Sequence, residues 1–402
     1  MPSGFDKKVC VLGLGYIGLP TAAVLASRGY AVHGVDVNED AVATINAGSA
    51  HIVEPDLDIL VRAAVQTGKL TANLAPVESD VFMICVPTPL DGRRPDITYV
   101  EKATKGMAPY LREGNLVILE STSPPGTTER IAEIIEAETG LRPPAYALAH
   151  APERVLPGRI LREVVENDRI VGGIDESSTR ACEEFYSTFV SGTLHCTNAR
   201  TAETAKLVEN AFRDVNIAFA NELSLVSERL DLDVWELIRL ANRHPRVNIL
   251  SPGPGVGGHC IAVDPWFLVH AAPEESNLIR AARQVNEGKP AWVVDRIARR
   301  ADRFKNPTIA CLGLAYKPDI DDLRESPSVE IVTKLMEQGI GELRVVEPNI
   351  KSHKAFPLSS LDDALTDADI VVFLVAHRQF QRIPPNRLAE KTIIDTCGVL
   401  RS

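Results

Sequence analysis

A short apolar run, residues 9–12, leads directly into the glycine pattern Gly13-x-Gly15-x-x-Gly18, and a helical pattern follows. Glycines at this spacing permit a tight strand-to-helix turn and let backbone N–H groups approach a pyrophosphate at the start of the helix. The next apolar run ends at Asp36, about 20 residues further on. A carboxylate there accepts hydrogen bonds from a ribose 2′-hydroxyl and repels a 2′-phosphate. The pattern therefore predicts a dinucleotide-binding domain that takes NAD in preference to NADP.

Further strands in the first half have the same character. Residues 81–86 and 116–119 are continuous apolar runs, and polar turns containing Thr88 and Thr122 follow them. Continuous apolar strands between helices are typical of a parallel sheet with both faces covered. The polar turns would then stand at the carboxyl edge of that sheet, where open α/β folds bind their ligands.

The alternation of strands and helices starts again near the C-terminus, with apolar runs at 308–312, 343–346 and 370–375. Between the two halves, residues 201–242 contain no Gly or Pro and are predicted to form a long helix. Five apolar residues at helical spacing are predicted to mark its buried face: Val208, Ala211, Phe212, Val215 and Phe219. Such a helix is also a plausible dimer surface.

The predicted fold class is therefore α/β, with two Rossmann-like doubly wound parallel-sheet domains joined by a central helical domain. The expected domains are 1–198 for NAD, 199–304 for dimerisation and catalysis, and 305–402 for a second nucleotide-type sheet.

Composition excludes several classes of protein. No apolar run approaches the roughly 20 residues that span a bilayer. The formal net charge of −11 argues against non-specific nucleic-acid binding. Seven scattered cysteines, odd in number and without Cys-x-x-Cys spacing, indicate neither a disulfide framework nor a metal site. The short polar N-terminus is not typical of a secretory signal, so we expect a cytoplasmic protein.

The segment Gly257-Gly258-His259-Cys260 places one cysteine in a glycine-rich approach, and Asp264 follows four residues later. A hydride acceptor alone converts an alcohol to an aldehyde. A thiolate beside it captures the aldehyde, allows a second hydride to leave and holds the product as a thioester, which water releases as an acid. Together with the glycine turn, this segment predicts a four-electron oxidation.

Motifs spread over the whole chain carry a family resemblance. They are the turn Gly13–Pro20, Val86-Pro-Thr-Pro89, Glu120-Ser-Thr122, Pro152-Glu-Arg154, Lys206 with Asn210, Gly257-Gly-His-Cys260, Lys317-Pro318 and Arg324-Glu-Ser-Pro327. In these the chain resembles the UDP-glucose/GDP-mannose dehydrogenase family of nucleotide-sugar 6-dehydrogenases. The resemblance implies an NAD-dependent oxidation of a sugar nucleotide at C6 and a homodimer.

The resemblance also implies roles for individual residues. Cys260 is the nucleophile, Lys206 the base or oxyanion stabiliser, Asn210 an oxyanion donor, and Asp264 a partner that orients water or shares a proton with Lys206. Thr122 and Glu153 resemble the pair that positions water for thioester hydrolysis. The positions that match cofactor contacts are Gly13, Gly15, Tyr16, Ile17, Gly18, Asp36, Thr88, Thr122 and Arg324.

The positions that match substrate contacts are Arg154, Val155, Lys206, Asn210, Arg213, His244, Arg246, Gly257, Tyr316 and Lys317. Lys206, Asn210 and Arg213 share one helical stripe, which periodicity alone would interpret as a solvated face. The family's UDP-glucose enzymes carry Pro-Lys-Asp after the cysteine, whereas this chain has Ala262-Val263-Asp264. That difference favours an N-acetylated sugar. Resemblance in residues 152–158, 212–222 and 241–248 puts UDP-N-acetylmannosamine first, with UDP-N-acetylglucosamine as the alternative.

Two other classes of function stay open at this point. A two-electron dehydrogenase of the hydroxyacid type has a similar layout and needs no thiolate. A nucleotide-sugar sensor would bind the same ligand without turnover.

Overall fold

A computed structural model describes residues 7–156 and 158–401 of the 402-residue chain. The chain forms two compact units. The first unit ends at Val208 and takes in Trp266–Ala271, and the second comprises Glu209–Pro265 and the chain from Ala272 onwards. Of the polar N-terminus, residues 1–6 lie outside the described part. No helix among the described residues is long and apolar enough to cross a membrane.

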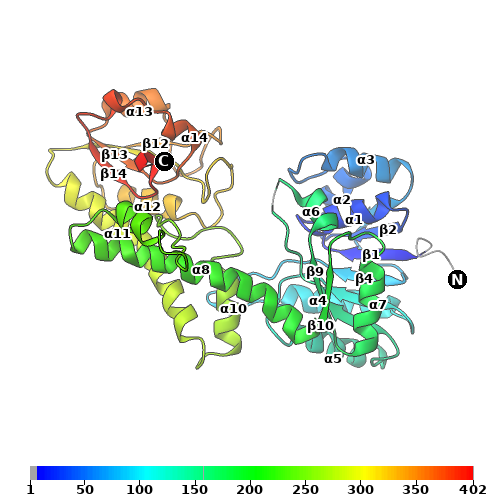
Figure 1. Cartoon of the computed structure of the whole chain (residues 1–402). Coiled ribbons are helices and arrows are strands. Elements are labelled where there is room, and N and C mark those ends of the chain that lie inside the picture. The colour runs from blue at the N-terminus through cyan, green and yellow to red at the C-terminus, as the bar shows by residue number, and fades with distance from the viewer. Residues whose placement is uncertain (1–6, 157, 402) are drawn as a thin grey trace. The chain divides into compact units, whose positions relative to one another are not determined.

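The first unit is built on an eight-stranded sheet with the order β10-β9-β8-β7-β4-β1-β2-β3 (Figure 1). Its neighbouring strands are parallel except for β8 and β9, which are antiparallel. The strands are β1 (Lys8–Leu12), β2 (Ala31–Val35), β3 (Leu70–Asn73), β4 (Val81–Ile84), β7 (Leu116–Leu119), β8 (Ala147–His150), β9 (Arg169–Gly173) and β10 (Leu194–Asn198). A small hairpin joins β5 (Leu90–Asp91) to β6 (Arg94–Pro95).

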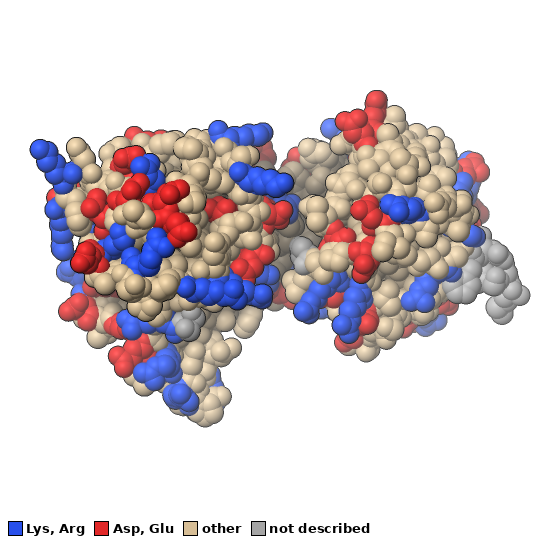
Figure 2. Space-filling view, turned by 90° about the horizontal axis from the view of Figure 1, so that it is seen from above, with Lys and Arg blue, Asp and Glu red and all other residues tan. Residues whose placement is uncertain are grey.

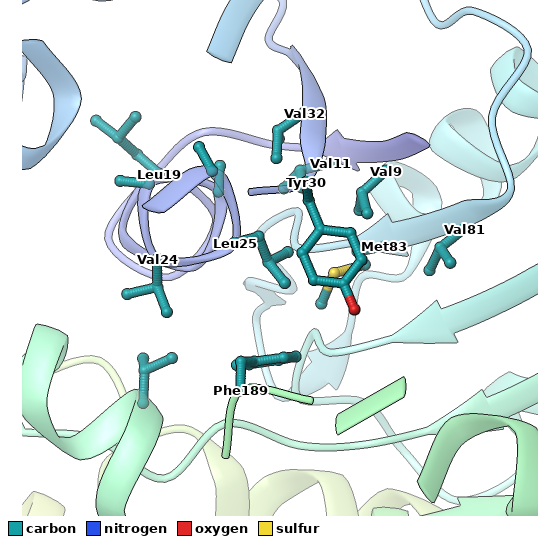
Figure 3. Close-up of a cluster of buried hydrophobic side chains, with 14 of the residues drawn as sticks. Val9, Val11, Leu19, Val24, Leu25, Tyr30, Val32, Val81, Met83 and Phe189 are labelled. Atoms are coloured by element: carbon teal, nitrogen blue, oxygen red, sulfur yellow. The ribbon is translucent and has the colours of Figure 1, made fainter. Parts of the chain in front are cut away.

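Alternate residues of each strand feed two different cores, because successive side chains of a strand point to opposite faces. Val9 and Val11 of β1 belong to a core with α1, α2, α3, α6 and α7, part of which is drawn in Figure 3. Cys10 and Leu12 belong to a core with α4 and α5. These helices are α1 (Gly18–Ser27), α2 (Glu39–Asn46), α3 (Leu57–Gln66), α4 (Thr98–Met107), α5 (Thr127–Thr139), α6 (Ile160–Glu166) and α7 (Glu176–Tyr186). The doubly wound arrangement predicted for the first half is confirmed.

The second unit contains a four-stranded parallel sheet with the order β12-β11-β13-β14. Helices α11 and α12 cover one face, and α13 and α14 cover the other. The strands are β11 (Thr308–Leu312), β12 (Glu342–Val346), β13 (Ile370–Phe373) and β14 (Thr392–Asp395). The helices are α11 (Asn277–Ala301), α12 (Pro327–Glu337), α13 (Leu361–Asp367) and α14 (Arg378–Gln381). The second doubly wound sheet is likewise confirmed, whereas the limits of the three predicted domains stay predictions.

The long helix expected over residues 201–242 is two helices. Helix α8 spans Ala199–Arg229 and α9 spans Val234–Ala241. Between them Asp231 has a left-handed backbone with φ of 54°, which ends the first helix. Asp233 then begins the second by accepting hydrogen bonds from the N–H groups of Trp235 and Glu236.

The buried face predicted for α8 is largely wrong for the single chain. Of the five residues named for it, Ala211 is buried, but Val208, Phe212 and Phe219 are exposed, with 68% of Phe212 accessible. The buried side instead carries polar residues that α11 satisfies. Asp214 accepts a hydrogen bond from Arg283 at 2.7 Å, and Asn221 donates to Asn286 at 2.8 Å. Apolar periodicity therefore found a stripe that is largely exposed among the described residues.

Charged side chains of both signs are interspersed over the face seen in Figure 2. The net charge of −11 is therefore not gathered into a single acidic patch on that face.

Candidate active site

The glycine turn after β1 has the close backbone contacts that its sequence predicts. Gly13 has a φ of 92°, and a Cβ there would lie 2.7 Å from the carbonyl oxygen of Cys85. At Gly18, the first residue of α1, a Cβ would overlap the carbonyl oxygen of Gly13 at 1.8 Å. Next to Gly15, by contrast, no described atom lies within 4 Å of such a Cβ, apart from its chain neighbours. The backbone is thus open at the one glycine where a pyrophosphate approaches, so the turn fits NAD.

Asp36 stands at the end of β2 and holds this turn. Its Oδ2 accepts the N–H of Leu14 at 2.9 Å, and its Oδ1 accepts the N–H of Asn38 at 2.9 Å. Each carboxylate oxygen keeps a second lone pair, which suits the two hydroxyls of a ribose. Tyr16 and Ile17 lie on the turn itself, exposed and half-buried respectively. Thr88 and Thr122 are also together, because Thr88 Oγ1 donates to the Thr122 carbonyl at 2.6 Å.

Glu153 lies beyond the end of β8 and is buried in a charged cluster that sequence analysis missed. Its Oε1 accepts the N–H of Arg154 at 2.7 Å, and its Oε2 accepts a hydrogen bond from Arg169 at 2.5 Å. The same guanidinium donates to Glu120 at 3.1 Å. Val155 follows, half-buried, at the start of a loop. No local pattern marks Arg169, because its partner Glu153 lies 16 residues earlier in the chain. The sequence also does not reveal that Arg169 begins an antiparallel strand.

In the second unit, Cys260 begins a helical turn that leads into α10 (Asp264–Ala271). Its carbonyl oxygen accepts the N–H groups of Val263 at 3.0 Å and Asp264 at 2.8 Å. The carboxylate of Asp264 is buried and accepts a hydrogen bond from Asn210 Nδ2 at 2.6 Å. The predicted nucleophile, carboxylate and amide therefore belong to one hydrogen-bonded frame. Asp264 is also the first residue of a helix, but its link to Asn210 shows that it does more than begin that helix.

The glycines before Cys260 pack against the turn after β11. A Cβ on Gly257 would lie 2.6 Å from the Glu325 carbonyl oxygen and 2.7 Å from Tyr316 Cβ. A Cβ on Gly258 would lie 2.9 Å from the Tyr316 ring. Burial raises the pKa of Tyr316, and charges on Asp322 and on the nearby Cys260 add to the rise. The structure thus brings Cys260, Gly257 and Tyr316 together.

The turn after β11 repeats the first four residues of the turn after β1 with one change, Ala315 in place of Gly15. Gly313 has a φ of 101°, and the N–H groups of Leu314 and Ala315 both donate to Glu347 Oε2, at 2.7 and 3.0 Å. Buried His377 also contacts this oxygen through Nε2 at 3.0 Å. Burial alone would raise the pKa of Glu347, but hydrogen bonds from His377 and from these N–H groups lower it to about 2. The carboxylate is therefore a permanent anion that holds the turn.

The remaining predicted residues are more open. Lys206 is half-buried and Arg213 exposed, both on α8, so the stripe they form with buried Asn210 runs from the core to the surface. Arg324 contacts Asp322 through two nitrogens, the shorter distance being 2.6 Å. His244 and Arg246 are exposed after α9, and Lys317 is exposed after β11. The roles of these residues stay predictions.

Comparison with known proteins agrees with this arrangement of sites. Residues 7–190, 200–288 and 310–402 match, in turn, the NAD binding, central and UDP binding domains of the UDP-glucose/GDP-mannose dehydrogenase family. An NDP-N-acetyl-D-galactosaminuronic acid dehydrogenase from Ralstonia nicotianae is 54% identical over 98% of this chain and 96% of its own. A UDP-N-acetyl-D-mannosamine dehydrogenase from Campylobacter jejuni is 53% identical over 95% of this chain and 98% of its own.

A solved UDP-D-ManNAc dehydrogenase from Pyrococcus horikoshii is 42% identical. It covers 98% of this chain, with 96% of its own length matched, and superposes with a TM-score of 0.90.

We expect Gly257→Ala to destabilise the second unit by about 1–3 kcal/mol, because the new methyl group meets backbone at Glu325. The nearby Gly253→Ala is the control, since the closest atom to its Cβ would be 3.8 Å away. The measurement is the free energy of unfolding in denaturant. Equal values for the two variants would contradict the packing of this loop on the turn after β11.

Proposed function

This chain belongs to the UDP-glucose/GDP-mannose dehydrogenase family of NAD-dependent nucleotide-sugar dehydrogenases, and we propose that it oxidises C6 of UDP-N-acetyl-D-mannosamine to the uronate. The observation that carries the proposal is the placement of Cys260 on the turn that begins at its own carbonyl oxygen and ends at Asp264, whose carboxylate is bonded to Asn210. A thiol on this turn can hold an aldehyde as a thiohemiacetal, a step that neither a two-electron dehydrogenase nor a sensor needs. The proposed reaction is therefore the four-electron oxidation of an alcohol to an acid.

In the first oxidation, the C6 hydroxyl gives its proton to water held by Lys206 and Asp264, and the developing oxyanion is stabilised by Lys206 and Asn210. NAD bound at the glycine turn would accept the hydride in this oxidation, and a second NAD would do so in the next. Asn210 is well suited to its role, because its bond to Asp264 fixes the amide in one orientation while the second N–H stays available.

In the second oxidation, the sulfur of Cys260 bonds to C6 of the aldehyde while the thiol proton passes to the aldehyde oxygen, which gives a thiohemiacetal. This thiohemiacetal loses a hydride from C6, gives its hydroxyl proton to water, and becomes a thioester. Water then adds to the thioester carbon, the carbon–sulfur bond breaks, and the sulfur leaves as a thiolate. Glu153 and Thr122 position that water, and one of its protons passes to Glu153. The sum is one sugar acid and two reduced cofactors for each substrate.

The second candidate substrate is the galacto isomer, because one of the most similar relatives is named for a galactosaminuronic acid. The gluco epimer is the third. We expect purified protein to give the highest kcat/KM with the manno sugar, by at least about tenfold, since a site that binds the polar substituents of a sugar rejects an isomer that misplaces the C2 N-acetyl group or the C4 hydroxyl. NADH formation with each UDP-sugar is the measurement. Preference for the galacto or the gluco sugar would reject the manno assignment and leave the reaction class intact.

We expect Cys260→Ser to lower acid formation by at least about a thousandfold, as removal of a covalent nucleophile does in other enzymes. Cys196→Ser is the control, because this cysteine is exposed on β10. The measurements are NADH and uronate formed per sugar consumed, with two NADH expected for the wild type. Full activity in Cys260→Ser, or one NADH per sugar, would support a two-electron dehydrogenase. UDP-sugar binding without any turnover in the wild type would support a sensor.

We also propose a cytoplasmic homodimer. All seven cysteines lie in the described residues and none of them forms a disulfide there, which is typical of a reducing compartment. The apolar stripe on α8 supports self-association: Phe212, Phe219 and Val226 repeat every seven residues and are exposed, as is Val208. A seven-residue apolar repeat is the pattern by which one helix packs along another.

Phe212→Gln combined with Phe219→Gln is expected to weaken dimerisation by at least about a hundredfold, because each buried Phe contributes about 1.5–3 kcal/mol. Sedimentation over a range of protein concentrations measures this. Val37→Gln, at another exposed apolar side chain, is the control. A monomeric wild type, or a double variant that dimerises as tightly as the wild type, would contradict the proposal.

A further inference from the structure

The buried cluster around Arg169 joins two carboxylates that lie at the ends of different strands. Glu120 follows β7, Glu153 follows β8 after two residues, and Arg169 is the first residue of β9. Arg169 is 3% exposed, Glu120 2% and Glu153 8%. Two carboxylates and one guanidinium in a dry interior are costly to bury, and an apolar core of the same size is often at least as stable. The cluster therefore needs a reason beyond stability.

The antiparallel strand explains how Arg169 comes to face Glu153. In the β8–β9 pair, His150 is opposite Gly172. If this register is continued for three residues, past the end of β8 and back to the start of β9, Glu153 stands opposite Arg169. A parallel β9 would begin at the far edge of the sheet and could not make this pair, because the carboxyl ends of parallel strands share one edge. The one antiparallel pairing of the described sheet thus delivers a cation to the end of β8.

Each partner in the cluster has a fixed place. Arg169 Nη1 donates to Glu120 Oε1 at 3.1 Å, and Tyr186 donates to the same oxygen at 2.8 Å. The Tyr186 ring also lies 4.7 Å from the guanidinium carbon of Arg169. Burial raises the pKa of Cys85 well above its usual value, so its sulfur keeps its hydrogen and donates to Glu120 Oε2 at 3.2 Å.

Glu153 is thereby held at both oxygens, by the Arg154 N–H and by Arg169. Each oxygen keeps one lone pair that can accept from water. Glu120, in contrast, accepts three hydrogen bonds, two at Oε1 from Tyr186 and Arg169 and one at Oε2 from Cys85, and it is 2% exposed. The two carboxylates therefore have different roles although they share one cation.

We propose that Arg169 and Glu120 are positioning residues that set the orientation and the electrostatic surroundings of Glu153 in the hydrolysis of the Cys260 thioester. The inference rests on the proposed role of Glu153. Arg169 places a positive charge beside Glu153, and Glu120 shares that cation and adds a second negative charge to the cluster. Burial raises the pKa of Glu120, Arg169 opposes the rise and the charge of Glu153 adds to it, as expected when two carboxylates share one cation.

The other titratable groups that face the cluster do not replace these two residues. Cys85 follows β4, and Cys182 and Tyr186 lie on α7; burial raises the pKa of all three, so they are neutral near pH 7. The Arg154 guanidinium is on the loop of Glu153 and donates to the carbonyl of Asp168. Charge changes at Glu120 and Arg169 should therefore act in opposite directions on the same step.

The test follows decay of the covalent thioester on Cys260 at a series of pH values, by rapid quenching and mass spectrometry of the full-length protein with NAD and UDP-sugar. In Arg169→Gln, hydrolysis should slow about tenfold to a hundredfold and its acid limb should move up by about one pH unit, because the carboxylates hold a proton more strongly. In Glu120→Gln, the acid limb should move down by a similar amount. Arg169→Lys, which keeps the charge, should restore part of the wild-type profile.

Arg283→Lys is the matched control, since Arg283 is equally buried, pairs with Asp214 and has no part in the proposed reaction. It should lower stability and leave the pH profile of hydrolysis unchanged. Shifts of the same sign in Arg169→Gln and Glu120→Gln, or slow hydrolysis without any shift, would show a purely structural cluster and overturn the inference. Glu153→Gln separates the two proposals: if it hydrolyses the thioester at the wild-type rate, the role of Glu153 is wrong and the inference fails with it.

Discussion

Parallel pairing of β1, β4 and β7 is the constraint on which the first unit depends. Their carboxyl ends meet at one edge, so the glycine turn, Cys85 and Glu120 become neighbours although they are separated by up to about a hundred residues of chain. The contact of the Gly13 position with the Cys85 carbonyl is possible only because both strands end there. Because β9 is antiparallel to β8, its first residue lies at the edge of the sheet where β8 and the strands parallel to it have their last residues.

Much of this edge can be predicted from the sequence. Continuous apolar runs gave β1, β4, β7, β11 and β13 to within two residues, because buried parallel strands have no polar side to interrupt them. The turns at Gly13 and Cys260 are recognisable because only glycine tolerates the close approaches found there. Local pattern is sufficient where the constraint itself is local.

Features that depend on pairing between distant segments were not predictable in this way. The pairing of Arg169 with Glu153 depends on the register of β9 against β8, and no spacing in the sequence predicts that register. The polar interior of α8 depends on Arg283 and Asn286 of another helix, so its buried positions look like a solvated stripe when read alone. The apolar stripe of α8 was misleading because Val208, Phe212 and Phe219 are exposed although they are spaced like the buried face of a helix.

Over their first four residues, 13–16 and 313–316, the two turns differ by one methyl group, at Ala315 where the first turn has Gly15. In the second turn Glu347 already occupies the N–H groups of Leu314 and Ala315, so neither can receive a phosphate. In the first turn Asp36 takes only the N–H of Leu14 and leaves the backbone at Gly15 open. Two similar turns thereby differ in what they can bind. The turn after β1 can receive the pyrophosphate of NAD, and the turn after β11 cannot.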